Sequence, residues 1–162
     1  IHEALKSLLN CKSDDILEHV GSLLDQKKEL EKEVHKLNLK MISATIDGLI
    51  TDAKVIKGMH VVASKIELPN GIELKDAGDH LREKLKTGVG ILASTNDDKV
   101  MFVCVVTDDL IRDKKYNAGH FVKEIAKIAG GSGGGRAHLA TAGANDKNKV
   151  DEALNNIFNL IQ

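Results

Sequence analysis

The sequence of 162 residues predicts an α/β protein, in which a long helix or helical hairpin precedes a small globular domain with a mixed sheet. Two differences in residue pattern along the chain support this prediction. Residues 1–51 are rich in Lys and Glu, contain no Pro and repeat apolar residues at heptad spacing. From residue 52 onward, short β-branched runs alternate with helical patterns. We therefore expect a coiled-coil-like helical region over residues 1–51 and a globular α/β domain over residues 52–162.

The helical region is predicted to begin with a short helix over residues 1–9, whose apolar side chains share one face. Ser13 is a typical N-cap, and Asp14 and Asp15 would lie in the first turn of the next helix, where the helix dipole favours acidic residues. Beyond this cap, apolar residues recur at steps of four and three as far as Ala44. At 1.5 Å per residue, this second helix would be about 50 Å long.

The heptad defines an apolar seam along the long helix. Leu17 and Leu24 widen the seam at its N-terminal end, which favours a hairpin with the short helix. Two alternatives stay open: the seam packs within its own chain, or it pairs with a second subunit to form a homodimer. The seam residues are Ile16, Val20, Leu23, Leu30, Val34, Leu37 and Met41, and Lys27 is the one misfit at a core position.

A row of lysines follows the long helix at a spacing of four residues. Such a row could follow a phosphate backbone. However, Glu29 and Glu33 lie where they can pair with Lys32 and Lys36 at i, i+3, so we expect a solvated face that neutralises itself. The row comprises Lys28, Lys32, Lys36 and Lys40.

The first half of the globular domain alternates strands and a helix. Two β-branched runs around Lys57-Gly58 predict a hairpin over residues 53–66. After the break at residues 68–71, helical spacing runs from Leu74 towards Gly88. A strand over residues 89–94, a turn at residues 96–98 and a buried strand over residues 100–106 complete this half.

The second half is predicted to be mainly helical. Thr107 would cap a short helix that ends at Lys114, and a second helix would carry Phe121 to Ile128. The glycine-rich run, residues 130–135, follows as a loop. A last helix would begin at Asn145 or Asp146 and present apolar residues of 150–158 on one face.

Composition excludes several classes of function. The 23 basic and 24 acidic residues give a net charge of −1, so no global field attracts nucleic acid and any such site must be a local patch. Aromatic residues are only 2% of the chain, which disfavours a stacking platform for single strands. Two cysteines, Cys11 and Cys104, imply no disulfide framework, and we expect a cytoplasmic protein. No apolar run reaches the length of a bilayer, so we expect no membrane partner.

The ends of the chain suggest a further expectation. The sequence begins at Ile1, without an initiator Met and directly in a helical pattern. We interpret the chain as a piece of a longer protein.

The sequence carries no recognisable catalytic or metal-binding pattern. The seven His are scattered, no tetrahedral ligand set appears at metal-binding spacing, and no G-x-S-x-G elbow occurs. We expect neither a catalytic residue nor a metal site. The glycine run has the glycine spacing of a P-loop, but Arg136-Ala137 replaces Lys-Ser and a helix precedes it, which excludes an NTPase.

The glycine run remains the strongest local anomaly. Five glycines in six residues cost backbone entropy on folding. A loop of this kind lets backbone N–H groups approach an anion or a sugar–phosphate backbone, with Arg136 as a forked donor. The alternative is a tight turn between a helix and a strand. Residues 108–136 carry six basic and four acidic residues, a local charge of +2 that favours grazing contact with phosphates.

A family resemblance rests on four segments. Residues 117–122 (NAGHFV), the run GGSGGGR at residues 130–136 and ATAG at residues 140–143 resemble the DHH-associated C-terminal domain. The segment LDQKKELEKEV at residues 24–34 resembles the helix that precedes this domain in the C-terminal (C-Ala) region of bacterial alanyl-tRNA synthetases. These segments occur in the family's order and, with the strands between them, cover nearly the whole chain.

The resemblance implies a non-catalytic region that binds the outer corner (elbow) of tRNA(Ala), aids dimerisation, and couples aminoacylation with editing. It implies no cofactor in this chain, because the ATP site and the zinc-dependent editing site belong to other parts of such enzymes, and no DNA partner. Two positions that are basic in the family are Asn117 and Ser132 here. The implied RNA-binding residues are Gly133, Gly134, Gly135 and Arg136, and the local charge adds Lys114, Lys115, Lys123 and Lys127.

Three alternatives come from other classes of protein. The chain could be the substrate-binding domain of a DHH-type phosphodiesterase, although the heptad helix and Arg136 after the glycines argue against it. It could belong to a freestanding alanyl-tRNA editing protein with the same C-terminal region. A purely structural dimerisation module without RNA contact would also suit the weak net charge.

Overall fold

The computed structural model describes residues 2–10, 12, 15–96 and 99–161. The chain divides into two compact units, Ile1–Asn38 and Leu39–Gln162. The expected limits of a helical region and a globular domain, at residues 51 and 52, stay a prediction. The expected cap at Ser13 and Asp14 lies outside the described residues, as does most of the expected turn at residues 96–98.

The first unit is helical. Helix α1 spans His2–Leu9, as predicted, and α2 spans Ile16–Thr51 and continues into the second unit. The side chains of Leu17 and Leu24 are exposed, so α1 does not cover the part of the seam that the hairpin would bury. Helix α1 has only eight residues, and its own Leu8 is exposed. Ion pairs at helical spacing support α2, including the predicted pair of Glu29 with Lys32 at 2.7 Å.

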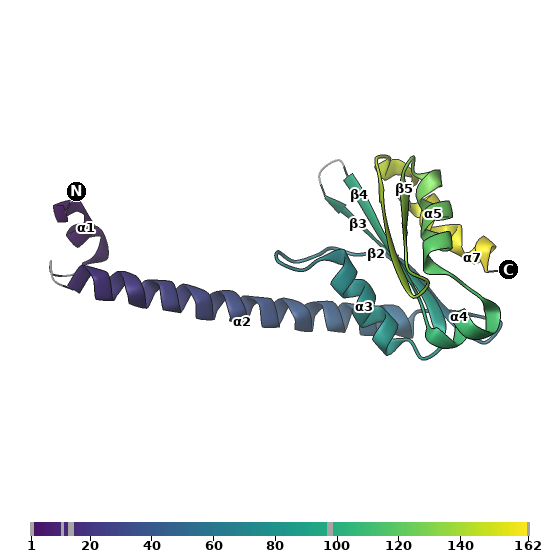
Figure 1. The fold of residues 1–162 in the computed structure, drawn as a ribbon, viewed down its shortest axis with the longest axis horizontal. Coiled ribbons are helices and arrows are strands. Elements are labelled where there is room, and N and C mark those ends of the chain that lie inside the picture. Colours follow the sequence, from purple (N-terminus) through teal and green to yellow (C-terminus); the bar gives the residue numbers. More distant parts are fainter. Residues whose placement is uncertain (1, 11, 13–14, 97–98, 162) are drawn as a thin grey trace. The chain divides into compact units, whose positions relative to one another are not determined.

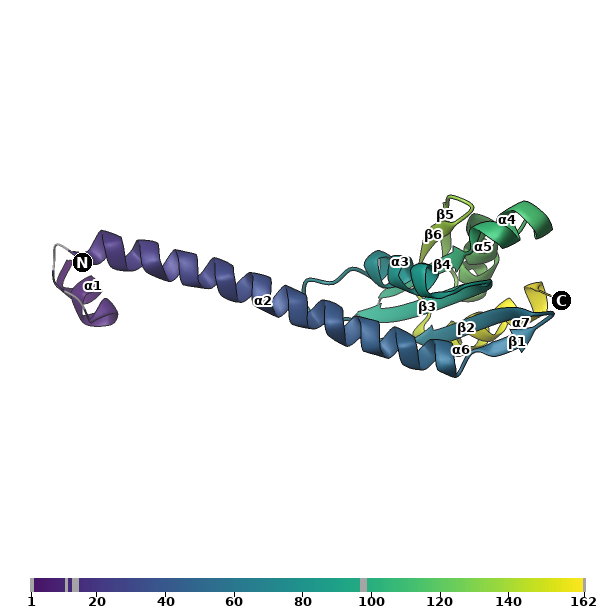
Figure 2. The same cartoon turned by 90° about the horizontal axis from the view of Figure 1, so that it is seen from below.

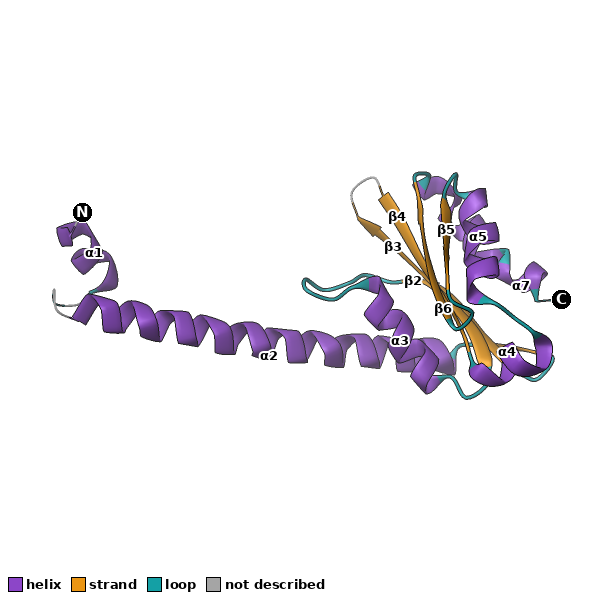
Figure 3. Cartoon of the chain, viewed as in Figure 1, coloured by secondary structure: helices purple, strands orange, loops and turns teal. Residues whose placement is uncertain are grey.

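The second unit is built on a six-stranded mixed sheet, in the order β1-β2-β3-β4-β6-β5 (Figures 1 and 3). The mixed α/β class predicted from the sequence is therefore confirmed. The strands are β1 (Lys54–Ile56), β2 (Met59–Lys65), β3 (Gly88–Asn96), β4 (Lys99–Val106), β5 (Ser132–Gly135) and β6 (Leu139–Ala144). Only β2 and β3 pair in parallel, because helix α3 (Leu74–Lys84) crosses over between them. The predicted hairpin around Lys57 and Gly58 forms β1 and β2.

One face of the sheet packs against α3 and the last turns of α2. Ile42 and Ile46 of α2 are buried together with Leu81 of α3 and Val103 of β4. Helix α3 approaches β4 closely at Gly78, where an added Cβ would lie 2.7 Å from a methyl carbon of Val103. The ammonium of Lys84 ties α3 to α2 through the Asp47 carboxylate at 2.6 Å. We call this face of the sheet the α3 side.

The opposite face packs against α5 (Ala118–Ile128), α6 (Val150–Asn155) and α7 (Ile157–Leu160), and we call it the α5 side. Phe102 and Cys104 of β4 are fully buried there, beneath Ile125 of α5. Figure 2, turned from the first view, shows α6 and α7 beside β1 and β2. A short 3-10 helix, η2 (Lys147–Lys149), precedes α6, and Asp146, one of the two predicted caps, caps it by accepting a hydrogen bond from the Asn148 amide at 3.0 Å.

Helix α4 (Asp108–Lys114) begins after Thr107, as predicted, but the cap differs from the expectation. The Thr107 hydroxyl does not cap the helix; it accepts a hydrogen bond from the Gly88 amide at 3.0 Å. It also lies 3.3 Å from the Gly88 carbonyl oxygen. The side chain therefore joins the end of β4 to the start of β3, because these antiparallel strands pair with Val89 opposite Val106.

Candidate functional site

The glycine-rich segment is an edge strand rather than the loop that the sequence predicts. Strand β5 pairs antiparallel with β6, from Ser132 opposite Gly143 to Gly135 opposite Ala140. All four residues of β5 are exposed. A run of glycines has no alternation of side chains, so its strand conformation depends on pairing with β6 rather than on a local pattern.

The glycines of this segment have different reasons to lack a side chain. An added Cβ at Gly131, Gly133 or Gly135 would collide with β6. At Gly134, by contrast, no heavy atom lies within 4 Å of the added Cβ. Internal packing therefore explains three of these glycines, while the side-chain position of Gly134 faces open space.

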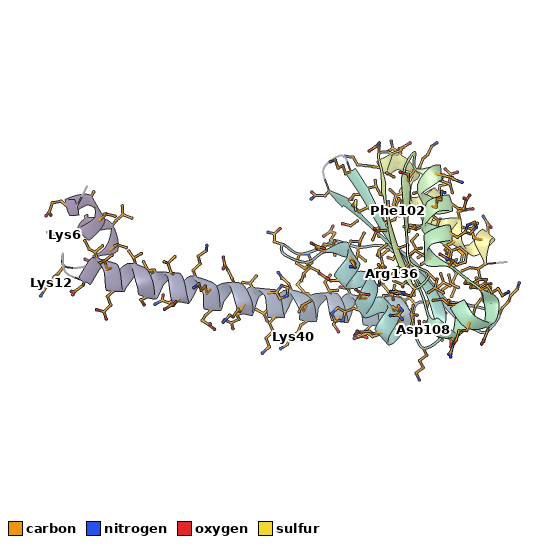
Figure 4. The ribbon with its side chains drawn as sticks, viewed as in Figure 1. Lys6, Lys12, Lys40, Phe102, Asp108 and Arg136 are labelled. Carbon is orange, nitrogen blue, oxygen red and sulfur yellow. The ribbon has the colours of Figure 1, made fainter. Side chains whose placement is uncertain are left out.

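Arg136 lies in the turn that joins β5 to β6 and is exposed (Figure 4). Its amide donates to the carbonyl oxygen of Leu139 at 3.0 Å, which makes these two residues a hydrogen-bonded pair. Among the described residues, no carboxylate forms an ion pair with the Arg136 guanidinium, which stays available to an anion. Because paired residues in a ladder share a face and Leu139 is buried on the α3 side, Arg136 and Gly134 belong to that side.

The start of α5 lies beside this strand but offers no amide to an anion. The Ala118 amide donates to Ala137, and the Asn117 side chain accepts from the amides of Gly119 and His120. The next amide, of Phe121, donates to the Asn117 carbonyl oxygen. The Ala-Gly step is instead a packing feature, because a Cβ at Gly119 would lie 3.0 Å from the Gly135 carbonyl oxygen.

The predicted lysines belong to α5 and to the end of α4, whereas Arg136 lies in the turn between β5 and β6. Lys123 and Lys127 are exposed residues of α5, on the other side of the sheet. Lys127 pairs with Glu124 at 2.6 Å, and this hydrogen bond holds the pKa of the Glu124 carboxyl below its usual range. Lys114 and Lys115 are exposed at the end of α4. The structure therefore places Arg136 directly after the glycine strand, whereas Lys123 and Lys127 belong to the helix that packs against that strand from the α5 side.

A pocket of about 430 Å³ near the start of α4 had no signal in the sequence. The Arg82 guanidinium contacts the Asp108 carboxylate there at 2.9 Å. Partial burial raises the pKa of Asp109, but hydrogen bonds from the hydroxyls of Thr107 and Thr87 and from backbone amides outweigh it and lower the pKa. Three basic side chains in the pocket face three acidic ones, so it concentrates no net charge.

A larger groove lies on the α3 side of the sheet, and sequence reasoning missed it too. Its volume is about 830 Å³, and it lies between the segment of residues 66–75 and the sheet residues Ser94, Met101 and Thr141. Only the pairing of the strands brings these three residues together. Across residues 2–10, 12, 15–96 and 99–161, no cluster of three His, Cys, Asp or Glu side chains suits a metal ion. Burial raises the pKa of the Cys104 thiol, which leaves it unreactive.

The heptad seam of α2 is a second candidate surface. Its large apolar residues are exposed, Leu30 to 62% and Met41 to 60%. Exposed apolar residues at heptad spacing mark a surface that a partner helix covers. The exposed seam residues are Val20, Leu23, Leu30, Val34, Leu37 and Met41, and Ile16 is half-buried. In the described part of the chain, no helix is long and apolar enough to cross a membrane.

Comparisons with known proteins identify the domain. The family model described as the DHHA1 domain matches residues 58–162, which include the glycine strand and the groove. The chain belongs to the DHHA1 domain family. The resemblance seen in the sequence is thereby confirmed for the second unit.

Curated relatives extend the similarity into the long helix. An alanine–tRNA ligase of Clostridioides difficile (strain 630) is 41% identical over 146 residues, which cover 90% of this chain and 16% of that protein. An alanine–tRNA ligase of Alkaliphilus oremlandii (strain OhILAs) is 36% identical over 98% of this chain and 18% of its own length. The chain therefore spans less than a fifth of the curated relatives it matches.

A solved structure gives the same result for the fold. The crystal structure of the C-Ala domain from Aquifex aeolicus alanyl-tRNA synthetase is 30% identical, with a TM-score of 0.57. It covers 65% of this chain and 93% of that domain. The chain is thus similar to the C-terminal region of alanyl-tRNA synthetases, as the sequence predicted.

Proposed function

We propose that this chain is a non-catalytic C-terminal region of an alanine–tRNA ligase, which binds the outer corner of tRNA(Ala) and aids dimerisation of the enzyme. The observation that carries the proposal is the similarity to such ligases along nearly the whole chain, long helix included. In this proposal the chain acts in the cytoplasm and couples aminoacylation with editing. Chemistry that needs ATP or zinc takes place in other parts of the enzyme.

The RNA-binding half of the proposal is supported by the glycine strand and Arg136. Backbone groups at an exposed edge strand can come close to a ligand, because no side chains shield them. The exposed Arg136 beside this strand, which forms no ion pair with any residue that the structure describes, supplies a forked donor for phosphate oxygens. RNA of this kind is recognised by shape and by contacts to phosphate and ribose, which suits a chain with a net charge of −1.

Dimerisation is supported by the exposed seam of α2. Leucines at seven-residue spacing, Leu23, Leu30 and Leu37, leave roughly half of their side-chain surface in water. Pairing with the same helix of a second copy would bury them. The similarity to the ligases includes this helix.

The proposal is tested by binding of a tRNA(Ala) transcript to the 162-residue chain at several salt concentrations. Arg136→Ala should weaken binding at least tenfold and flatten the salt dependence by about one phosphate contact. Lys40→Ala, which removes an exposed charge from α2, is the matched control and should leave binding unchanged.

Sedimentation equilibrium on the same samples tests the other half. We expect a dimer that binds tRNA more weakly as salt rises. A dimer that ignores tRNA at low salt would instead indicate a purely structural module. A monomer that ignores tRNA would contradict both halves.

A further inference from the structure

We infer that the RNA lies against the open α3-side face of β5, β6 and β4, with its sugar–phosphate backbone over Gly134 and a neighbouring nucleoside in the groove beneath residues 66–75. This inference rests on the proposed function and says which surface carries the contact. It divides the glycines into those that the fold needs and those that a ligand needs.

The helical layer on the α3 side ends before it reaches the edge of the sheet. Residues that pair across β6 and β4 form rows on one face, and Ser132, Gly143 and Met101 make one such row. Met101 is 45% exposed, and Ser132 and Gly143 are exposed. Packing on the α3 side therefore buries Val103 and Leu139 but leaves Met101, Gly143 and β5 exposed. We call this exposed surface, with Gly134 and Thr141 in the next row, the shelf.

Gly134 has no structural reason to be glycine. Its φ lies outside the left-handed region that favours glycine, and no heavy atom lies within 4 Å of an added Cβ. A glycine inside a strand weakens it, and it often marks a place where a ligand comes close to the backbone. Since the protein itself leaves this position empty, the group that requires the space comes from outside.

Gly143 on the neighbouring strand repeats this observation. The nearest atom to an added Cβ there is the Met101 sulfur at 3.9 Å, an ordinary van der Waals distance. Gly134 and Gly143, which both have room for a Cβ atom, thus lie on the same face of adjacent strands. At these two positions a polymer can approach the backbone directly, between the side chains of Ser132, Thr141 and Met101.

The chemistry around the shelf suits a ribose–phosphate chain. Arg136, which forms no ion pair with any described residue, lies one row beyond Gly134 on the same face and can hold a phosphate. The hydroxyls of Ser132 and Thr141 lie along the shelf and can donate to or accept from a ribose hydroxyl. Arg136 and the neutral hydroxyls favour grazing contact over a deep electrostatic groove, and the adjoining groove adds the charged side chains of Glu67, Glu73 and Lys75.

The groove of about 830 Å³ continues from the shelf, since Thr141 and Met101 line both. Its volume lies within the range of sites that take small organic groups. Thr95 and Asn96 provide hydrogen-bonding groups at its wall, and the Met101 thioether provides a polarisable contact for an aromatic base. One unstacked nucleoside that projects from the polymer would therefore fit the groove.

The test compares Gly134→Leu with Gly48→Leu in the 162-residue chain, with a tRNA(Ala) transcript as the probe. Both positions are exposed, and both leave an added Cβ without a neighbour within 4 Å. Gly134→Leu should unfold at about the temperature of the parent chain and raise the dissociation constant at least tenfold. Gly48→Leu should leave the dissociation constant unchanged.

Thr141→Val is the second variant, because it removes a shelf hydroxyl at constant shape and remains informative if Gly134→Leu is unstable. We expect it to weaken tRNA binding three- to tenfold. Binding within twofold of the parent for both Thr141→Val and a folded Gly134 variant would overturn the shelf, and loss of binding in Arg136→Ala would then leave the proposed function standing. If the parent chain binds no tRNA, the proposed function and this inference fail together.

Discussion

Helix α2 contains the same kinds of residue on both sides of Asn38, but its apolar side chains meet different surroundings. Before this residue, Leu23, Leu30 and Leu37 are exposed. After it, Ile42 and Ile46 are buried against α3 and the sheet. Packing within the chain therefore stabilises the last turns of the helix. Its first turns are stabilised only by local helix propensity and ion pairs unless a partner covers them.

The largest expected effect separates these two parts of α2. Ile46→Ala should lower the free energy of unfolding of the second unit by about 3 kcal/mol, because it leaves a cavity beneath a fully buried side chain. Leu37→Ala, at an exposed position, should change the same quantity by less than about 0.5 kcal/mol. Urea unfolding followed by the fluorescence of Tyr116, the single tyrosine of the chain, measures both. Equal losses in the two variants would contradict the comparison.

A charge placed in the exposed part of α2 tests whether a partner helix covers the seam. Leu30→Glu should raise the dissociation constant of the dimer at least about thirtyfold, or roughly 2 kcal/mol, because a carboxylate would be buried between the helices. Unfolding of the second unit should not change. Glu31→Gln is the neighbouring control, and sedimentation equilibrium provides the measurement. If Leu30→Glu dimerised as well as the parent, the seam would not be the dimer contact.

Within the second unit, two adjacent glycines should differ. Gly133→Ala should cost about 1–3 kcal/mol of stability, because its Cβ would collide with Ala142. Gly134→Ala should stay within about 0.5 kcal/mol of the parent, because its Cβ meets open space. Thermal unfolding of both variants measures this difference in stability. A large loss for Gly134→Ala would show that the fold, and not a ligand, needs this glycine.

The smallest effect depends on pH. The folded state lowers the pKa of Asp109, so its ionised carboxylate stabilises the fold above the unfolded pKa of about 3.9. This stabilisation is lost as the pH falls through the folded pKa. Asp109→Asn should therefore lower stability by less than about 1 kcal/mol at pH 7, and the difference should vanish in strong acid. Asp113→Asn, on the same helix, is the control. If the stability difference between Asp109→Asn and the parent did not change with pH, the ionised Asp109 carboxylate would not be its source.

The elements with a clear side-chain period could be predicted from the sequence. The heptad spacing predicts α2 and the apolar run predicts β4, and the structure contains both elements. The hairpin at Lys57 and Gly58 was also predictable, because this pair adopts a left-handed backbone. These are local signals, so they need no knowledge of distant contacts.

The candidate site could be predicted only in part. The sequence singles out Arg136 and the glycines as candidates, but it predicts a loop where β5 is a strand, because that conformation comes from pairing with β6. Proximity in sequence also grouped Lys123 and Lys127 with Arg136, although the sheet lies between α5 and the α3 side. The groove unites residues from segments far apart in the chain, and neither spacing nor composition carries that information.

The composition of β5 has one more consequence. An edge strand presents unpaired backbone groups, and a long apolar edge invites pairing with a second molecule and aggregation. Strand β5 has only four residues, Ser-Gly-Gly-Gly, and glycine is among the poorest strand formers. A foreign strand would gain almost no side-chain contact by adding to it. The lack of side chains that leaves this edge accessible to the proposed RNA ligand thus also protects the sheet from unwanted strand addition.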